Sequence, residues 1–168
     1  MSILLNLVLI KLKLKREREL KKSKLILVYI LIPLLLIQFV PVDRENPPVD
    51  ESITLTAPPE IIAILKNSCY DCHSNETEWP FYSYIAPVSW LVERDVEFGR
   101  DDLNFSEWNK MTENDREHAK EEIIEEISRD TMPMPIYIVT HPSASLSVEN
   151  KLALKNWLTG RETKMHTH

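Results

Sequence analysis

The stretch "NSCYDCHSNETEWP", residues 67–80, holds both cysteines of the 168-residue chain, three positions apart, with a histidine directly after the second. Three kinds of site use such a cluster: a dithiol redox pair, a metal site and an attachment site for haem. Which of these Cys69, Cys72 and His73 form determines what kind of core the chain builds. The rest of the sequence distinguishes among the three.

Two of the alternatives lack the surroundings that they require. A thioredoxin-like redox pair needs CxxC beside a βαβ pattern, and the chain shows no convincing strand alternation and only two glycines. A structural zinc site needs four ligands, so the cluster would have to recruit His118 or His141 without a second paired motif. A plain disulfide across two residues closes too small a loop to add much stability.

Haem attachment accounts for all three residues. Each thiol adds to one vinyl group of the macrocycle, and the histidine that follows is then held beside the iron as an axial ligand. We therefore predict one covalently bound haem c per chain, with Cys69 and Cys72 as attachment residues and His73 as an iron ligand. The macrocycle would also supply much of the core of this short chain.

A sixth iron ligand is expected in "DTMPMPIYIVTHP", residues 130–142. A proline after Met132 and another after Met134 remove backbone donors and favour an extended loop, which can present a thioether to the iron. Composition does not separate the two methionines, and either could instead fill a gap in the core. His141 is expected to be a hydrogen-bonded loop residue.

The N-terminal part of the chain is predicted to be a membrane anchor. Residues 1–24 carry eight basic and two acidic residues, so the remaining chain has a formal charge of −12 against +6. Residues 25–42 are uncharged, and 18 residues form about 27 Å of helix, enough to cross a hydrocarbon core. No small-residue cleavage site follows. We expect an uncleaved transmembrane helix with residues 1–24 in the cytoplasm.

This orientation places the rest of the chain in the periplasm, at the outer face of a bacterial inner membrane, where c-type haem is attached. Residues 43–57 are rich in proline and acid and are predicted to form a tether. Residues 58–160 are predicted to form an all-α, cytochrome c-like haem domain, followed by a tail at 161–168. Helices are expected over 58–68, 86–98, 112–130 and 147–160, the last two capped by Thr112 and Ser147.

The sequence resembles the bacterial haem-binding domain family, a cytochrome c-like group common in membrane-anchored proteins. The resemblance is carried by the CxxCH stretch and by "IQFVPVDRENPP", "LNFSEWN", "MPMPIYIVTHPSASLS" and "NKLALKNWL". It implies covalent haem at Cys69 and Cys72 with His73 as proximal ligand. It also selects Met132 over Met134 as the sixth ligand. The segment "TEWPFYSYIAPVSW" would then form the wall of the haem pocket, through Trp79, Phe81, Tyr82 and Trp90.

Electron transfer is the function expected of such a domain, which would then not be an enzyme. The acidic body suggests a redox partner with a basic docking patch, although acidic residues can also serve solubility alone. No nucleic-acid partner is expected. Two other classes remain open: a peroxidase-like enzyme with a free sixth position, and a haem-based redox or gas sensor. An absorption spectrum distinguishes these classes.

Overall fold

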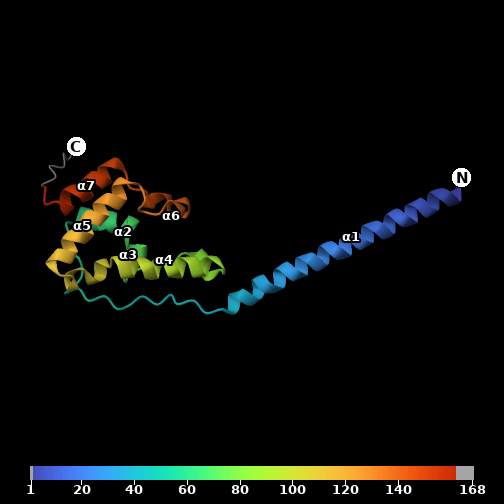
Figure 1. Cartoon of the computed structure of the whole chain (residues 1–168), viewed down its shortest axis with the longest axis horizontal. Helices are drawn as coiled ribbons and strands as arrows, with labels where there is room; N and C mark the ends of the chain where they lie inside the picture. The colour runs from blue at the N-terminus through green and yellow to red at the C-terminus, as the bar shows by residue number, and fades with distance from the viewer. Residues whose placement is uncertain (1, 162–168) are drawn as a thin grey trace.

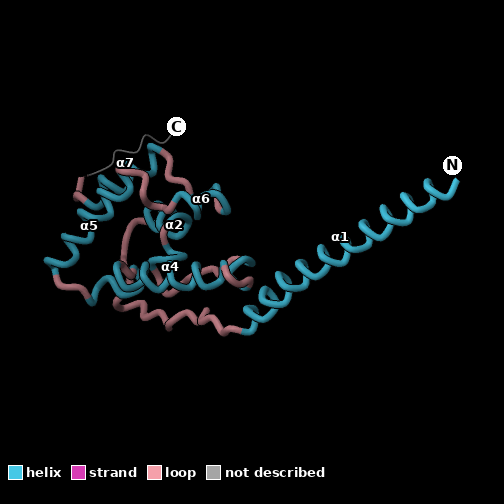
Figure 2. The backbone as a smooth tube through the Cα atoms, turned by 45° about the vertical axis from the view of Figure 1, so that its right-hand side comes forward, coloured by secondary structure: helices cyan, strands magenta, loops and turns pink. Residues whose placement is uncertain are grey.

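The computed structural model describes residues 2–161, so the expected tail lies outside the described residues apart from Arg161. The described residues form helices, 3-10 turns and loops with no β-strand, which confirms the predicted all-α class (Figures 1 and 2). The first helix, α1 (Ser2–Leu36), extends away from the remaining helices, which pack together into one body (Figure 1).

The expected transmembrane helix is not found. Among residues 2–161, no helix is both long enough and apolar enough to cross a membrane. The uncharged part of α1 covers only residues 25–36, about 18 Å of helix. The apolar run then leaves the helix at the 3-10 turn η1 (Ile37–Phe39). Here the Gln38 amide donates to the carbonyls of Leu34 and Ala86 and accepts from the Ala86 N–H, which holds the chain against the domain.

Residues 43–57, which we call the strap, do not stand away from the domain as the predicted tether would. The strap runs along α4 in Figures 1 and 2. Arg44 donates to the Ser83 carbonyl at 3.0 Å, and Asn46 accepts from Arg100 at 2.8 Å. Leu55 is buried in the core. The prolines keep the strap extended, and these side chains bind it to the domain.

The body is built from six further helices: α2 (Pro59–Ser68), α3 (Tyr70–His73), α4 (Val88–Asp102), α5 (Glu113–Ser128), α6 (Pro135–Thr140) and α7 (Val148–Leu158). Three 3-10 turns connect them: η2 (Phe81–Tyr84), η3 (Phe105–Lys110) and η4 (Pro142–Ala144). The four longest of these helices lie close to the predicted ranges. The two expected caps form, because the Thr112 and Ser147 hydroxyls accept from the backbone N–H groups of Asp115 and Asn150.

The core lies where α2, α5 and α7 meet η3. Leu65 and Leu154 are fully buried there. Phe105, also fully buried, stacks on Tyr70 with ring centroids 5.5 Å apart and on Trp108 at 6.2 Å. Because Phe105 follows α4 and Tyr70 lies in α3, this aromatic stack fixes η3 behind the CxxCH turn.

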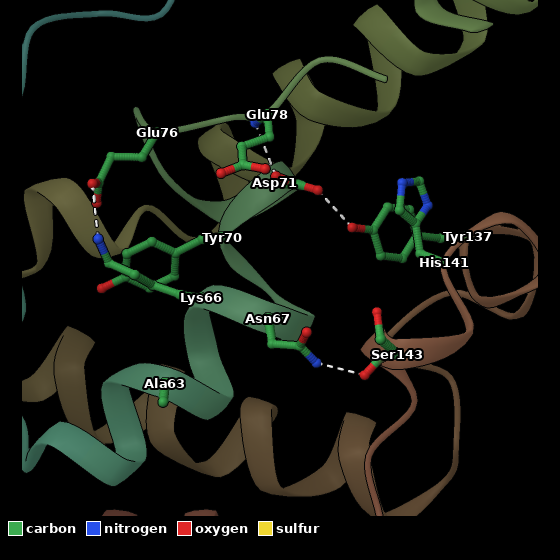
Figure 3. Close-up of a pocket in the computed structure, with 10 residues that line it drawn as sticks. All are labelled: Ala63, Lys66, Asn67, Tyr70, Asp71, Glu76, Glu78, Tyr137, His141 and Ser143. Atoms are coloured by element: carbon green, nitrogen blue, oxygen red, sulfur yellow. Dashed lines mark hydrogen bonds and ion pairs between the residues drawn. The ribbon is translucent and has the colours of Figure 1, made fainter. Parts of the chain in front are cut away.

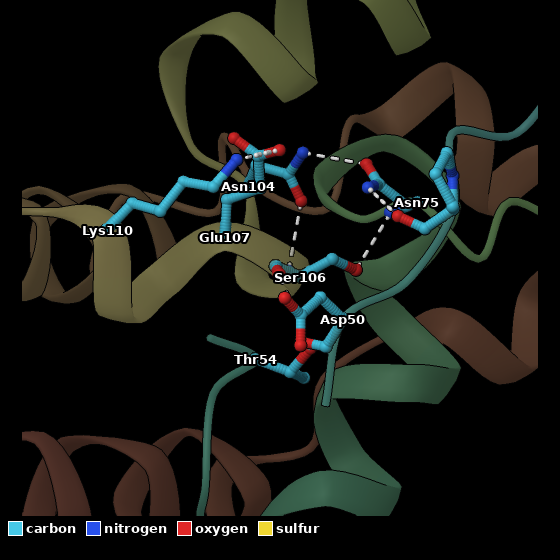
Figure 4. Close-up of polar contacts among 8 residues, drawn as sticks. Asp50, Thr54, Asn75, Asn104, Ser106, Glu107 and Lys110 are labelled. Carbon is cyan, nitrogen blue, oxygen red and sulfur yellow. Dashed lines mark hydrogen bonds and ion pairs between the residues drawn. The ribbon is translucent and has the colours of Figure 1, made fainter. Parts of the chain in front are cut away.

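A buried polar network holds η3 in this position (Figure 4). The Ser106 hydroxyl accepts from the Asn75 backbone N–H at 3.0 Å, and the Asn104 amide donates to the Asn75 side chain at 2.9 Å. Thr54 of the strap donates to the Ser106 carbonyl. The network thus joins the strap and η3 to the segment that follows His73. Its polar groups bond to one another and need no water as a partner.

Candidate functional site

The CxxCH motif occupies a single helical turn. Cys69 ends α2 and begins α3, and its carbonyl accepts from the N–H groups of Cys72 at 3.2 Å and His73 at 2.9 Å. One turn of helix therefore holds both sulfurs and the imidazole in a fixed mutual arrangement. Both cysteines are free thiols, so no disulfide occupies the motif.

Helix α4 approaches this turn closely at Gly99. A Cβ atom at position 99 would lie 2.7 Å from the Cys72 carbonyl oxygen and 3.1 Å from the Cys72 Cβ. Only glycine allows the backbones of α3 and α4 to come so near. The close approach brings the last carbonyls of α4 within reach of the histidine.

The orientation of His73 is set by those carbonyls. Its Nδ1 lies 2.8 Å from the Gly99 oxygen and 3.1 Å from the Leu103 oxygen. Because carbonyl oxygens only accept hydrogen bonds, Nδ1 carries the proton and Nε2 keeps its lone pair. This is the tautomer that a metal-binding imidazole requires, and a backbone carbonyl on the opposite nitrogen is its usual support.

The two thiols have raised pKa values. Burial raises the pKa of Cys69 to about 12, and the nearby Cys72 thiol adds to the effect. Burial also raises the pKa of Cys72 to about 11, with Asp71 and Asp95 contributing in the same direction. Reactive redox cysteines instead have lowered pKa values, as does a thiolate that binds a metal. The thiols are therefore protonated at neutral pH, unlike those of a thioredoxin-like pair.

Two cavities flank His73. The large cavity, about 580 Å³, lies between His73 and α5. Its apolar wall comes from Leu103, Phe105, Ala119, Ile123 and Ile127. The small cavity, about 180 Å³, lies on the side of α4 and α6 and is lined by Cys72, Phe98 and Tyr137, among others.

Cys69, His73 and Met132 line both cavities, whereas Met134 lines only the small one. The described residues thus bring the predicted sulfur and nitrogen donors together from α3 and from the loop after α5. An imidazole nitrogen and a thioether sulfur form the axial ligand pair of a His/Met haem, and the large cavity has the volume and apolar lining typical of a cofactor site. The residues present therefore fit a haem group.

The predicted pocket wall is wrong. Neither cavity is lined by Trp79, Phe81, Tyr82 or Trp90. Phe81 is 79% exposed, and the Trp79 indole donates to Asn46 of the strap instead. The aromatic rings beside the motif are those of Phe98, Phe105 and Tyr137, which come from α4, η3 and α6. Sequence reasoning missed them because these elements fold back onto α3 from distant positions.

The two histidines considered as additional ligands make other contacts. His118 lies on the exposed face of α5, where its Nε2 is 3.3 Å from Glu122. His141 stacks on Tyr137 with ring centroids 4.2 Å apart. Neither histidine lines the two cavities beside the CxxCH turn.

Comparison with known protein families matches residues 32–160 to the haem-binding domain. The matched range is well over half of the chain and includes the CxxCH turn and all the helices from α2 to α7. It also includes residues 129–134, the loop between α5 and α6 that holds Met132 and Met134 and that we call the methionine loop. No curated protein and no solved structure matches the chain.

Proposed function

Because the chain belongs to the haem-binding domain family, we propose that it carries its haem covalently, as one haem c per chain. Cys69 and Cys72 would each form a thioether to the macrocycle. The proposal is supported by two free thiols that lie within one helical turn. Cys69 lines both the cavity of about 580 Å³ and the small cavity, and Cys72 lines the small one. Their protonated state suits addition to a vinyl group, in which the sulfur bonds to carbon and the thiol hydrogen is transferred to the neighbouring carbon.

The observation that carries the proposal is the position of His73 Nδ1 beside the backbone carbonyls at the end of α4. The Gly99 carbonyl, 2.8 Å from Nδ1, keeps the proton on that nitrogen and leaves Nε2 free to bind iron. His73 would therefore be the proximal ligand.

The sixth ligand would be Met132, with Met134 as the alternative. Met132 lines both cavities together with His73, whereas Met134 lines only the small one. A thioether opposite an imidazole raises the reduction potential of haem iron relative to nitrogenous ligands. A filled sixth position favours electron transfer over a peroxidase-like or gas-sensing function, because the latter two need an open position.

Electron transfer is thus the activity that this site supports best. Bound haem would supply an iron centre that alternates between the ferric and ferrous states. The protein contributes the surroundings: Phe105, Ile123 and Ile127 give the large cavity beside His73 an apolar wall, and the last turn of α4 fixes the imidazole. Such a preorganised site needs little rearrangement when an electron is gained or lost.

The redox partner is proposed to present a basic patch. Carboxylates surround both cavities: Asp71, Asp95, Asp102, Glu122, Glu125 and Glu126. Arg129 is the one cation among the residues that line them. Opposite charges accelerate encounter and orient the two proteins so that the haem side faces the partner.

The haem domain is proposed to function outside the cytoplasm, in the periplasm. The proposal rests on the thioether chemistry, because c-type haem is attached in that compartment. A reporter enzyme that is active only after export, fused after His168, would be active under this proposal. An active reporter of the cytoplasmic type at the same position would contradict it.

Covalent attachment is tested on the full chain produced with a haem-maturation system. After acid–acetone extraction and denaturing electrophoresis, peroxidase-stainable haem is expected to stay on the polypeptide. Replacement of either cysteine, Cys69→Ser or Cys72→Ser, should leave a single thioether, and replacement of both should release all the haem. Colour that leaves the wild-type chain entirely with the solvent would contradict covalent attachment while leaving haem binding itself intact.

A further inference from the structure

Helix α6, which directly follows the methionine loop, is not held to the body by apolar burial. None of its residues is buried, and its two largest apolar side chains on the outer side, Ile136 and Val139, are 71% and 73% exposed. A six-residue helix with no buried side chain is only marginally stable by itself. Its polar contacts therefore contribute strongly to where the helix lies, while Pro133 of the preceding loop is buried.

The main polar contact joins α6 to the CxxCH turn (Figure 3). The Tyr137 hydroxyl donates to the Asp71 carboxylate at 2.6 Å, and Asp71 is one of the two residues between the cysteines. The other oxygen of Asp71 accepts from the Glu78 backbone N–H at 2.9 Å. Asp71 is thus a fixed acceptor, and a hydrogen bond to a charged acceptor is stronger than one between neutral groups.

Tyr137 is equally well connected to the methionine loop. Its backbone N–H donates to the Met134 carbonyl at 2.9 Å, and its ring stacks on His141 at 4.2 Å (Figure 3). The same ring lines the small cavity together with Met132. On its other side it borders a third cavity of about 460 Å³. Tyr137 therefore lies between the third cavity and the small cavity, which Met132 and Met134 also line.

The other end of the methionine loop is tied to α5, where the Thr131 hydroxyl lies within hydrogen-bond distance of both the Glu126 carbonyl, at 3.0 Å, and the Glu126 carboxylate. The N–H groups of Thr131 and Met132 share the Glu126 carbonyl, at 3.2 and 3.4 Å. The loop thus has one end on α5 and the other on α6, and α6 is fixed to the attachment turn through Tyr137.

We propose that Tyr137 is a positioning residue for Met132. Its hydrogen bond to Asp71, which we call the clasp, holds the methionine loop against the turn that contains His73. The proposal rests on the proposed covalent haem and on Met132 as sixth ligand. The clasp would keep the thioether beside the iron and oppose its replacement by an added ligand.

The test is Tyr137→Phe in the full haem-loaded chain, with imidazole as the competing ligand. Phenylalanine keeps the ring on His141 and removes only the hydroxyl. We expect covalently attached haem as in the wild type, a weaker thioether-to-iron absorption band, and an affinity of ferric iron for imidazole about tenfold higher, the factor expected for one charge-assisted hydrogen bond. Hydrogen exchange over residues 131–141 should also be faster.

The matched control is Tyr84→Phe, because Tyr84 is exposed and its ring lies beside Arg44 rather than the haem cavities. It should bind imidazole as the wild type does. Asp71→Asn replaces the charged acceptor by a neutral amide and should raise imidazole affinity in the wild-type background but have little further effect in Tyr137→Phe, because both changes weaken the same contact.

Three results would overturn the proposal. The first is an imidazole affinity of Tyr137→Phe within twofold of that of the wild type. The second is full additivity of the effects of Tyr137→Phe and Asp71→Asn on that affinity. The third is a wild-type spectrum without the thioether band. Retention of stainable haem in each case would confine the failure to the clasp or to Met132. Loss of stainable haem from the wild type would instead contradict the covalent attachment on which the clasp depends.

Discussion

His73 illustrates how much of the site is set by single atoms. Its identity as a ligand is predicted from its place after Cys72, but its tautomer depends on the Gly99 carbonyl, 26 residues away. The Leu103 carbonyl lies on the same side. Backbone acceptors cannot be removed by a side-chain substitution, so the protonation of Nδ1 is robust to most sequence changes.

The choice between the two methionines is the prediction that belongs to this scale. Met132→Ala should abolish the thioether-to-iron band and lower the reduction potential by on the order of 0.1 V, well within the range that axial ligands span. The reason is that Met132, unlike Met134, lines both cavities that meet at His73. Absorption spectroscopy and redox titration measure the two effects.

Met134→Ala is the matched control. Met134 is only partly buried, so its loss should cost less than the about 2–5 kcal/mol of a fully buried methionine and should leave the band in place. If the band survives in Met132→Ala and disappears in Met134→Ala, the ligand is Met134. Survival of the band in both single variants would mean that each methionine can replace the other as ligand, whereas a wild-type spectrum without the band would mean that no methionine binds the iron.

The motif residues could be proposed as a site from the sequence because they are contiguous, and their roles as attachment residues and iron ligand stay predictions. The aromatic wall could not. Phe81 and Phe105 have similar character in the sequence, yet the first is exposed and the second is fully buried. The difference arises from the 3-10 turns η2 and η3, whose direction depends on distant partners rather than on local pattern.

At the scale of elements, the close packing of α4 on α3 does most to build the site. Gly99→Ala should favour α4 by about 1 kcal/mol through helix propensity alone. The added Cβ would lie 2.7 Å from the Cys72 carbonyl, however, and backbone cannot move aside as a flexible side chain does. We expect a net destabilisation of about 1–3 kcal/mol, measured by urea unfolding of the haem-loaded chain.

The control for this substitution is Glu97→Ala, an exposed position on the same helix, where the effect should stay within about 0.5 kcal/mol. Gly99→Ala should also weaken the hydrogen bond from His73 and therefore shift the reduction potential, which Glu97→Ala should not. A Gly99→Ala variant more stable than the wild type would show that α4 can move away without loss.

The helices were predictable to the extent that their signals are local. Thr112 and Ser147 cap their helices because a hydroxyl needs only the next turn, and Gly160 ends the last helix region with a positive φ of 66°. The strap was not predictable as part of the domain, because it is held by pairs such as Asn46 with Arg100, 54 residues apart. Apolarity likewise predicted a helix through residue 42, whereas Gln38 ends it by bonding to Ala86.

The whole molecule combines a basic N-terminal helix with an acidic haem domain. Residues 1–24 are a net +6 and the rest a net −12, and carboxylates predominate around the two cavities. Because α1 extends away from the body, its positive charges lie apart from the haem site (Figure 1). A small ion that approaches the haem therefore meets a negative field, and salt screens that field.

Rates of oxidation by small complexes measure this field. As ionic strength rises from about 0.01 M to about 1 M, the screening length falls from about 30 Å to about 3 Å. Oxidation of the reduced, haem-loaded chain by the cation hexaammineruthenium(III) should then slow by about tenfold or more, whereas oxidation by the anion ferricyanide should accelerate.

The double variant Asp102→Asn with Glu122→Gln removes two carboxylates that line the cavities and should flatten the dependence of both rates on ionic strength, the two slopes. The control Glu60→Gln with Glu149→Gln changes net charge equally at positions that do not line the cavities and should leave the slopes close to those of the wild type. Slopes flattened equally in the two double variants would mean that total charge, rather than the carboxylates around the haem site, governs encounter, and a basic docking patch on the partner would lose its support.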